Sequence, residues 1–460
     1  MKDDNSLWQQ AVLKFPRLLL HTSSGCSRPL FAVNMETRLL VLLVCLQVFC
    51  TAGNVCDFKE KQHLIQTLTR KLLKATQDDS VPNPSIHIGL RLAKYHNHEM
   101  ENSYLQRLRK ERESDFLART GPEYQKEPVT GLLALHILAL QASCENLDNQ
   151  TGKQLITQLK RALHSEKEHI ATYDKPLSNY YQYSMGILAL CINGKKIDHH
   201  VIGRLIQAEK RKKFMHHDSQ SVDTEAMAGL ALQCLEQSDF MYTDQLRTDI
   251  NNTIKSLKKK IIESRSAEGI IGNIFSTPLA VQALHAMGQE DACSGSAEAL
   301  LGQAEVGTFH NPMALSLLIP VLHQKTYQDI ANIDCSDEDN TLTTSHSGLN
   351  QLGNEIKVTF MVQNIGSTNN EYEDTVFVPQ GSSLLEVLKT AHKEKPKHFA
   401  YEIKDSLWGP FLSSVNGITA DVERRTYWQI LKDRNIHLME GIADYKPHDG
   451  DHIILRLSTW

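Results

Sequence analysis

Apolar residues gather in six short segments between residues 57 and 330. Each segment combines a small residue with closely spaced Leu and Ala, and successive segments begin roughly 35–55 residues apart. They are apolar nearly all round, which predicts buried helices rather than strands. The segments are IGLRLA from Ile88, GLLALHILAL from Gly131, GILALCI from Gly186, AGLALQCL from Ala228, PLAVQAL from Pro278 and MALSLLIPVL from Met313.

Charged, amphipathic segments separate the apolar ones, for example TGKQLITQLKRALHSEKEHI from Thr151 and LRTDINNTIKSLKKKIIESR from Leu246. One buried helix alternating with one amphipathic helix predicts two concentric layers. A closed α/α barrel is the simplest such object, and an open solenoid is the alternative. We expect this helical domain to occupy residues 54–333.

The pattern changes after residue 333. The polar residues 334–353 are typical of a linker. Beyond them, IKVTFMVQ, TVFVPQ and HIILRLS alternate apolar and polar residues as strands do, and SLLEVLKTAHK from Ser383 has the pattern of an amphipathic helix. Residues 354–460 are therefore predicted to form a small α+β domain, in a chain that is mainly α.

The N-terminal residues carry a targeting pattern. Residues 39–49 (LLVLLVCLQVF) are an apolar run that follows Arg38 and precedes small residues, which is typical of a secretory signal peptide at residues 35–53. Residues 1–34 read as an upstream extension without structure of its own. No other segment is long and apolar enough to anchor the chain, so we expect a soluble, secreted, extracellular protein without membrane insertion.

Composition and cysteine usage agree with this class. The formal net charge is −5, without a basic block, which argues against binding to nucleic acid or anionic membranes. Six cysteines remain after residue 53, and an even number in a secreted chain predicts three disulfides, whose pairing the spacing alone leaves open. Asn149 and Asn251 begin N-x-T acceptors for glycosylation.

Signatures of catalysis are scarce. The chain contains no HExxH, GxSxG, P-loop or GxGxxG motif. His216, His217 and Asp218 could form a metal cluster, but they follow a basic stretch and read as a solvated loop. Asp223 is the best acid for a glycosidase, which needs two carboxylates, and the sequence offers no convincing second one. Asp223 is also typical of the first turn of a helix.

Neutral hydrogen-bonding residues stand where the buried helices are expected to start. In a barrel these starts gather at one rim, which suits a large neutral ligand rich in amides. Helix capping is the alternative role for Ser178, Ser221 and Ser276. Gln182 and Gln282 lie inside otherwise apolar helices, where a buried amide needs partners. The candidate rim residues are Ser178, Asn179, Tyr180, Tyr181, Gln182, Ser221, Val222, Asp223, Thr224, Asn273, Ser276 and Gln282.

Several of these motifs resemble the cobalamin-transport family of transcobalamin, intrinsic factor and haptocorrin. The motifs are SNYYQYSMGILALC, SVDTEAMAGLALQCL, GNIFSTPLAVQAL, GTFHNPMALSLLIPVL, RTYWQIL and GIADYKPHDGD. The similarity is greatest to transcobalamin, with some motifs closer to intrinsic factor. It implies an α6/α6 barrel joined to a small α+β domain, with cobalamin held between them. It also implies the disulfides Cys56–Cys293, Cys144–Cys335 and Cys191–Cys234.

The resemblance assigns ligand contacts position by position. It places residues 178–182 against the corrin amides, makes Asp223 an acceptor, and adds Asn273 and Ser276. Its second-domain segment corresponds to Trp428, Gln429 and Ile430. Three positions depart from the family pattern: Leu132 and Leu317 stand where the family has Gln, and Ser219 stands where transcobalamin has a cobalt-coordinating His. Ser219 remains a candidate contact, and His217 could coordinate the cobalt instead.

Three functions follow from these observations. The first is a secreted, monomeric cobalamin carrier without enzyme activity, taken up through an endocytic cell-surface receptor. The second is an α/α-barrel glycoside hydrolase, which requires paired acids in the mouth of the barrel. The third is a secreted interaction protein that kept the fold and lost the ligand, in line with Leu132, Leu317 and Ser219.

Overall fold

The computed structural model describes residue 58 and residues 61–77, 81–119, 130–216, 219–289, 292–336, 338–343, 355–363, 372–406, 409–421, 426–433, 436–438 and 440–459. The predicted signal peptide and residues 1–34 lie outside this part of the chain.

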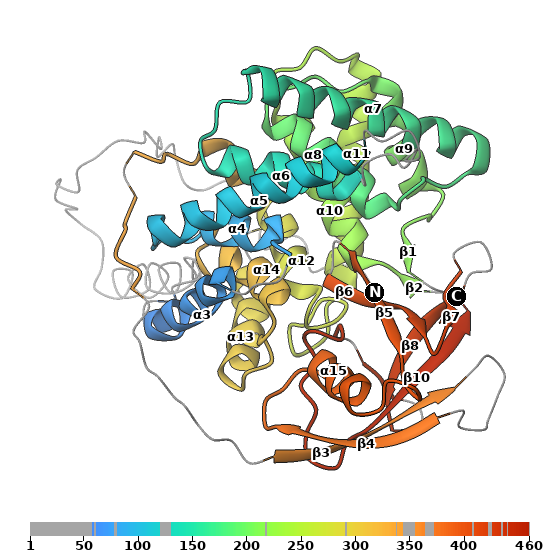
Figure 1. Ribbon diagram of the computed structural model, residues 1–460. Helices are drawn as coiled ribbons and strands as arrows, with labels where there is room; N and C mark the ends of the chain where they lie inside the picture. Colours follow the sequence, from blue (N-terminus) through green and yellow to red (C-terminus); the bar gives the residue numbers. More distant parts are fainter. Residues whose placement is uncertain are drawn as a thin grey trace, which may run out of the picture. The chain divides into compact units, whose positions relative to one another are not determined.

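A ring of buried helices forms the centre of the helical part (Figure 1). Each helix of this ring carries one of the apolar segments, and each packs against the next. The last of them, α14, packs back against the first, α4, so the ring is closed. The predicted α/α barrel is therefore confirmed, and the open solenoid is excluded. The inner helices among the described residues are α4 (Pro84–Arg91), α6 (Thr130–Ala142), α8 (Tyr180–Ile192), α10 (Val222–Gln237), α12 (Thr277–Ala286) and α14 (Pro312–Leu322).

A second layer of helices surrounds the ring. These helices are amphipathic: α7, for example, buries Leu155, Leu159 and Leu163, which are spaced so that they share one face. Each outer helix returns the chain to the side where the next inner helix begins. The outer helices are α3 (Gln62–Lys74), α5 (His98–Arg119), α7 (Gln150–Tyr173), α9 (His199–Lys210), α11 (Asp244–Glu263) and α13 (Ala292–Glu305), with the short helices η2 (Ala75–Gln77) and η3 (Tyr327–Asn332).

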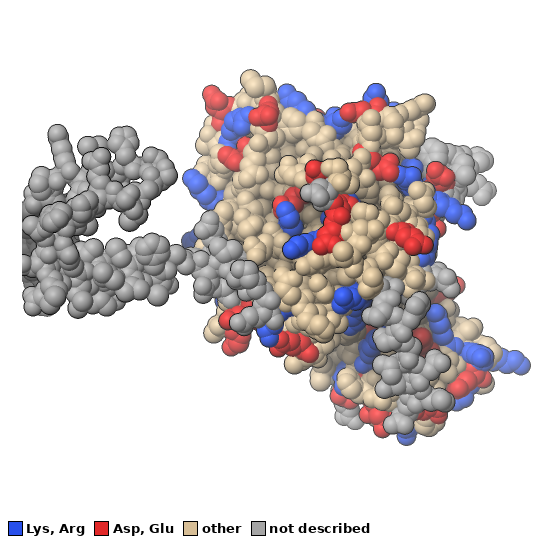
Figure 2. Space-filling view, turned by 90° about the vertical axis from the view of Figure 1, so that its left-hand side faces the viewer, with Lys and Arg blue, Asp and Glu red and all other residues tan. Residues whose placement is uncertain are grey.

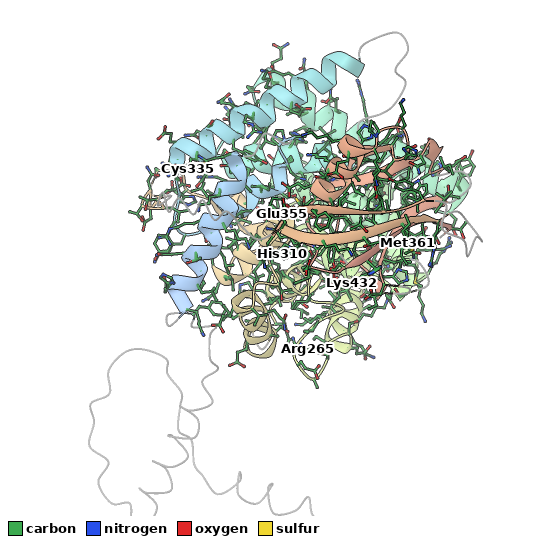
Figure 3. All side chains as sticks on the ribbon, turned by 60° about the horizontal axis from the view of Figure 1, so that its bottom comes forward. Arg265, His310, Cys335, Glu355, Met361 and Lys432 are labelled. Carbon is green, nitrogen blue, oxygen red and sulfur yellow. A yellow bond between two sulfur atoms is a disulfide. The ribbon has the colours of Figure 1, made fainter. Side chains whose placement is uncertain are left out.

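Two disulfides are formed among the described side chains, one between two helices of the ring and one that joins the ring to residue 335. Cys191 of α8 is bonded to Cys234 of α10, with Cα atoms 6.2 Å apart. Cys144, just after α6, is bonded to Cys335, with a Cα separation of 6.3 Å (Cys335 is labelled in Figure 3). Both are pairings that the family resemblance implies. The third pairing, Cys56–Cys293, lies outside the described side chains.

The beginning of the predicted linker packs on the helical part. Asp339 forms a β-bridge with Tyr95, and the Leu342 N–H donates to the His96 carbonyl at 3.0 Å. Glu338 pairs with the buried Arg91 of α4. Residues 338–343 therefore pack along the turn between α4 and α5.

The C-terminal part is α+β, as predicted. A five-stranded sheet has the order β4-β3-β10-β8-β9, in which β3 and β10 are parallel and the other pairs are antiparallel. A second sheet has the order β5-β6-β7. The sequence pattern predicted β3, β4, β10 and α15 but missed β5, β6, β7, β8 and β9. The elements are β3 (Glu355–Gln363), β4 (Tyr372–Pro379), α15 (Leu384–Glu394), β5 (Tyr401–Ser406), β6 (Gly409–Val415), β7 (Ile418–Thr419), β8 (Thr426–Lys432), β9 (Ile436–His437) and β10 (His452–Thr459).

Helix α15 covers one face of the larger sheet. Val387 and Leu388 of this helix are fully buried in one cluster with Phe360 of β3. The helix begins with a capping box, in which Ser383 accepts from the Glu386 N–H and the Glu386 carboxylate accepts from the Ser383 N–H. The sequence predicted this helix start at Ser383.

The surface carries both signs of charge. On the face drawn in Figure 2, Lys and Arg side chains are intermingled with Asp and Glu, and wide uncharged areas separate them. Within the described residues, no helix is long and apolar enough to cross a bilayer.

Candidate functional site

The candidate site is the rim where the inner helices begin. Since every outer helix returns the chain, the starts of α8, α10 and α12 lie at the same end of the ring. Side chains there bond from one helix start to the next. The Gly131 N–H, at the start of α6, donates to Oε1 of Gln182 in α8 at 3.2 Å.

Asp223 and Ser276 connect the starts of α10 and α12. The Ser276 hydroxyl donates to Oδ2 of Asp223 at 2.8 Å. Asn273 fixes the approach to α12, because its Oδ1 accepts from the Phe275 and Ser276 N–H groups at 2.8 and 2.9 Å. Gly272 has φ 69°, and a Cβ there would lie 2.8 Å from Cγ2 of Val222. The turn before α12 is therefore packed directly on the start of α10.

Ser221 caps α10, as one of the sequence alternatives proposed. Its Oγ accepts from the Thr224 N–H at 3.3 Å and from the Thr224 hydroxyl at 2.9 Å. Asp223 lies in the first turn, where the helix dipole favours a carboxylate. Capping and first-turn roles do not remove these residues from the rim, because Asp223 is half-buried and lies beside Ser276.

Ser178 has a structural partner that the sequence did not reveal. Its hydroxyl donates to the buried Glu166 of α7 at 2.5 Å, and its N–H donates to the same carboxylate at 3.1 Å. Thr130 donates to Glu166 at 2.8 Å from the start of α6. Glu166, inside α7, thus ties the starts of α6 and α8 to the outer layer. Asn179, rather than Ser178, caps α8, accepting from the Gln182 N–H at 2.9 Å.

Tyr180 and Tyr181 are largely buried behind the exposed Asn179. Tyr180 packs edge to face on Tyr183 and against Phe214. Burial, assisted by Asp174, raises the pKa of Tyr180 to about 12. Burial raises the pKa of Tyr181 well above its ordinary value, with smaller contributions from Tyr327 and Asp223. Both phenols therefore stay neutral at physiological pH.

The two candidate glutamines differ in position. Gln182 is half-buried at the rim, beside the start of α6. Gln282 is only 1% exposed. Its Nε2 donates to the Leu317 carbonyl at 2.9 Å, and its Oε1 accepts from the Tyr327 N–H at 3.2 Å. The structure thus places Gln282 inside the ring wall, where the protein itself supplies partners for its amide.

A short hairpin leads into α10. Strands β1 (Met215–His216) and β2 (Ser219–Gln220) pair antiparallel, and Ser219 is exposed. His217 and Asp218 lie between these strands, outside the described residues. The Gln220 amide donates to Oε1 of Glu225, which links the hairpin to α10.

Glu225 is a buried acid that the sequence reasoning missed. It is fully buried, and its Oε2 has no hydrogen-bond partner among the described residues. Burial raises its pKa to about 7, against the opposing effect of Lys260. The signal that could have revealed it was a second acid two residues after Asp223, directly before the apolar residues of α10.

The two acids of α10 do not form a facing pair. Asp223 bonds to Ser276 of the neighbouring inner helix, whereas Glu225 faces Glu209 of α9 and Lys260 of α11 in the outer layer. Two residues apart on a helix, they point to different neighbours. Among the residues that the structure describes, Asp223 and Glu225 therefore do not supply the two facing carboxylates that a glycosidase needs.

Trp428 lies in the core of the C-terminal part. It is 6% exposed, and its indole N–H donates to the Ile418 carbonyl at 3.0 Å. Gln429 and Ile430, which follow it on β8, are half-buried. The Gln429 amide donates to the Tyr427 hydroxyl at 3.0 Å. Of these three candidates, Gln429 and Ile430 keep the greater access to the surface.

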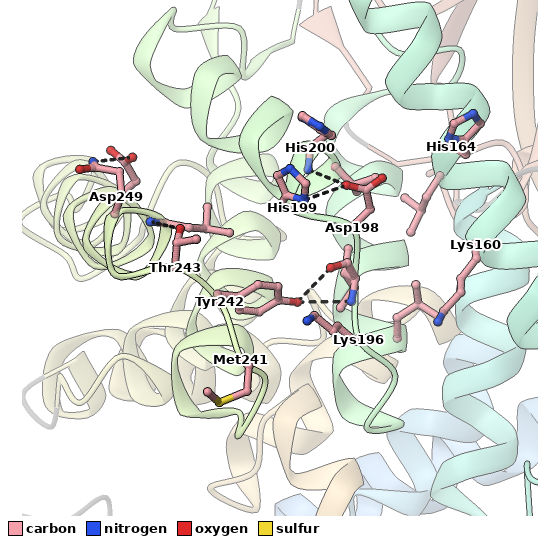
Figure 4. Close-up of a pocket in the computed structure, with 16 residues that line it drawn as sticks. Lys160, His164, Lys196, Asp198, His199, His200, Met241, Tyr242, Thr243 and Asp249 are labelled. Atoms are coloured by element: carbon pink, nitrogen blue, oxygen red, sulfur yellow. Dashed lines mark hydrogen bonds and ion pairs between the residues drawn. The ribbon is translucent and has the colours of Figure 1, made fainter.

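A large hollow lies on the outer layer (Figure 4). It measures about 860 Å³ and is bordered by α7, α9 and α11. Asp198, His199 and His200 stand at its edge, exposed, with potential ligand atoms within 4.8 Å of one another. None of them was a candidate from the sequence. The Asp198 carboxylate already caps α9 by accepting from the His200 N–H at 2.8 Å.

The comparisons with known proteins agree with the architecture. A family model described as "Eukaryotic cobalamin-binding protein" matches residues 38–351, and a domain of unknown function, DUF4430, matches residues 381–459. Transcobalamin-2 of Mus musculus is 40% identical over 82% of this chain and 88% of its own length. Transcobalamin-2 of Homo sapiens is 38% identical over 91% of this chain and 98% of its own length.

Two further relatives place the chain within this group. The cobalamin binding intrinsic factor of Canis lupus familiaris is 31% identical over 87% of this chain and 92% of its own length. A crystal structure of haptocorrin in complex with Cbi superposes with a TM-score of 0.69 at 26% identity, covering 88% of this chain and 99% of that one. Identity is thus higher to these transcobalamin-2 sequences than to intrinsic factor or haptocorrin.

Proposed function

Because this chain belongs to the family of eukaryotic cobalamin-binding proteins, we propose that it is a carrier that binds cobalamin at the rim of the inner ring. Cobalamin is a flat macrocycle with many peripheral amides. Hydroxyl, amide and carboxylate side chains are suitable partners for such groups. The observation that carries the proposal is the contact between Asp223 and Ser276, which sets an acceptor between two helix starts. Asn273 and Gln182 add uncharged amides nearby on the same rim.

The C-terminal domain would close over the bound ligand. Each hydrogen bond contributes only about 0.5–1.5 kcal/mol net, so tight binding needs many of them together with apolar burial. The β8 residues Trp428, Gln429 and Ile430 are the proposed contacts from this side. Tight closure also slows dissociation, since both domains must separate before cobalamin leaves.

Secretion and delivery complete the proposal. An apolar run at residues 39–49, followed by small residues, supports export through the secretory pathway. The carrier would act as a monomer outside the cell and reach its targets through an endocytic receptor. N-terminal sequencing of the protein from the culture medium tests the first point, with a start near residue 54 expected. Uptake of labelled cobalamin by receptor-bearing cells tests the second.

His217 is the proposed source of a protein ligand to the cobalt. It lies between the paired strands β1 and β2, which lead directly into α10 and Asp223. A neutral imidazole coordinates cobalt, whereas a protonated one does not. The absorbance spectrum of aquocobalamin bound to the wild-type chain would therefore show coordination of cobalt by imidazole, and the spectrum with His217→Ala would not. Cyanocobalamin would bind to the two chains equally well. Identical aquocobalamin spectra would show that cobalt keeps its own upper ligand.

An absorbance titration with cyanocobalamin tests the carrier function. We expect the wild-type chain to retain the red ligand after desalting, and Asp223→Ala to bind it about 10–100-fold more weakly, because a hydrogen bond to a charged acceptor is lost. Asp244→Ala is the matched control, since Asp244 is also a first-turn acid but lies exposed on the outer helix α11. Equal affinity of all three chains would refute the assigned contact. A wild-type chain that retains no ligand would favour an interaction protein that has lost cobalamin.

A further inference from the structure

His310 of the helical rim contacts the C-terminal part of the chain. It precedes Asn311, the residue that caps α14. Its Nε2 lies 2.7 Å from the carbonyl oxygen of Asp444 and 2.8 Å from Oε2 of Glu440 (His310 is labelled in Figure 3). Both neighbours are acceptors, so Nε2 must carry the hydrogen. A single imidazole thus holds two residues of the segment 440–444, just before β10.

The contact is well shielded from solvent. The side chains of His310 and Glu440 are 21% and 17% exposed. Oε2 of Glu440 is buried and has no hydrogen bond of its own among the described residues, so the imidazole is the group that compensates its charge. Removing His310 would leave this carboxylate buried and unpaired, which costs more than the loss of an exposed ion pair.

The neighbouring charges decide how this contact responds to pH. The Glu440 carboxylate raises the pKa of His310 above its ordinary value, although burial and Lys71 act in the opposite direction. Burial, followed by Glu440, raises the pKa of the Asp444 carboxyl to about 6, and His310 opposes this. Lys71 of α3 reaches the Phe309 carbonyl at 3.4 Å and faces Lys446. His310 is therefore the group whose protonation adds an ion pair across the contact.

We propose that His310 is a positioning residue that fastens the segment 440–444 to the rim and thereby slows the release of bound cobalamin. This inference rests on the proposed carrier function, because release is the event that it controls. Nε2 donates its hydrogen bond whether the imidazole is neutral or protonated. Protonation adds an ion pair with Glu440 and so strengthens the contact. Since the pKa of His310 is raised, the added stabilisation is complete at low pH and is lost as the pH rises through that pKa.

Dissociation of cyanocobalamin tests the proposal. Stopped-flow exchange against excess competitor would give a wild-type release rate that increases from pH 6 to pH 8. His310→Ala would release the ligand about tenfold faster at pH 6 with a flatter pH profile. His310→Gln keeps a neutral donor, so it would restore part of the slow release without restoring the pH dependence. His285→Ala is the control, because His285 is exposed in the last turn of α12, at the opposite end of that helix.

A readout without ligand separates this proposal from the carrier function. Hydrogen exchange of the apo chain would show faster exchange at Asp444 and Tyr445, whose N–H groups bond to the Gly441 carbonyl, in His310→Ala but not in His285→Ala. If His310→Ala shows faster exchange but the wild-type chain binds no cobalamin, the lack of binding refutes the carrier function, and the role of His310 in holding the segment 440–444 still stands. Unchanged exchange in His310→Ala, or unchanged release with an unchanged pH profile, would overturn the role of His310.

Discussion

Gly89 of α4 lies directly against the backbone of Ser316 of α14. A Cβ on Gly89 would lie 2.8 Å from both the Cα and the carbonyl oxygen of Ser316. This is the place where the first and last inner helices meet and close the ring. Backbone atoms cannot move aside as a flexible side chain can, so the close approach requires a residue without a side chain.

Gly89→Ala is expected to destabilise the protein by about 1–3 kcal/mol, because the added methyl group forces α4 away from α14. Gly203→Ala is the matched control, since Gly203 lies within α9 and a Cβ there meets nothing within 4 Å. In that control, better helix propensity predicts a gain of about 0.5–1 kcal/mol. Urea unfolding measures both changes. A neutral Gly89→Ala would mean that the ring closes less tightly at this point.

Glu225→Gln is expected to change how stability depends on pH. The folded-state pKa of Glu225 is raised to about 7, so the folded chain holds this proton more tightly than the unfolded chain. The resulting stabilisation is complete below the ordinary pKa and is lost as the pH rises through about 7. A neutral Gln at 225 should therefore be more stable than wild type by about 1–2 kcal/mol at pH 8 and similar at pH 5.

Urea unfolding at pH 5, 6.5 and 8 measures this difference. Glu263→Gln serves as the control, because Glu263 is 61% exposed at the end of α11 and its variant should follow the wild-type pH profile. If wild type and Glu225→Gln lose stability in parallel between pH 5 and pH 8, Glu225 is ionised in the folded chain throughout that range.

Arg91→Met is expected to destabilise the helical part by about 3–5 kcal/mol, because the buried carboxylates of Glu101 and Glu338 lose their guanidinium partner and keep only the imidazoles of His96 and His98 beside them. Arg91, at the end of α4, donates to the Ala142 carbonyl at 2.9 Å and pairs with Glu101 and Glu338. A triple variant, in which Glu101→Gln and Glu338→Gln accompany Arg91→Met, removes the two carboxylate charges as well. It should recover much of the lost stability.

Thermal unfolding gives the required comparison. The control is Arg211→Met, which breaks a largely exposed pair with Asp174 and should lower the Tm far less than Arg91→Met does. Equal losses in Arg91→Met and in the triple variant would show that packing of the Arg91 side chain, rather than its charge, holds these elements together.

The architecture could be predicted from the sequence because its main signal is local. Segments such as those starting at Gly131 and Gly186 are apolar all round, and such a helix must be covered on both sides. The amphipathic segments between them had to supply that cover. β8 was missed as a strand because TYWQIL lacks clear alternation, and its place follows from pairing with β10, not from its own pattern.

The candidate site was less predictable, because its polar groups bond between different elements and not within one. Ser178 pairs with Glu166 of the preceding outer helix, and Gln282 reaches Tyr327 beyond α14. Sequence reasoning could state that Gln282 needs partners but could not choose between the protein and a ligand. Glu225 was missed for a similar reason, because its burial depends on the packing of α9 and α11 around α10.

Closure of the ring through Gly89 and Ser316 also determines the order in which the chain can fold. The first inner helix must wait for the last one, which leaves the ribosome only after the whole helical part has been synthesised. Until then, one edge of α4 exposes apolar side chains to solvent. A chain truncated before residue 312 would lack α14 and would leave that edge of α4 permanently uncovered.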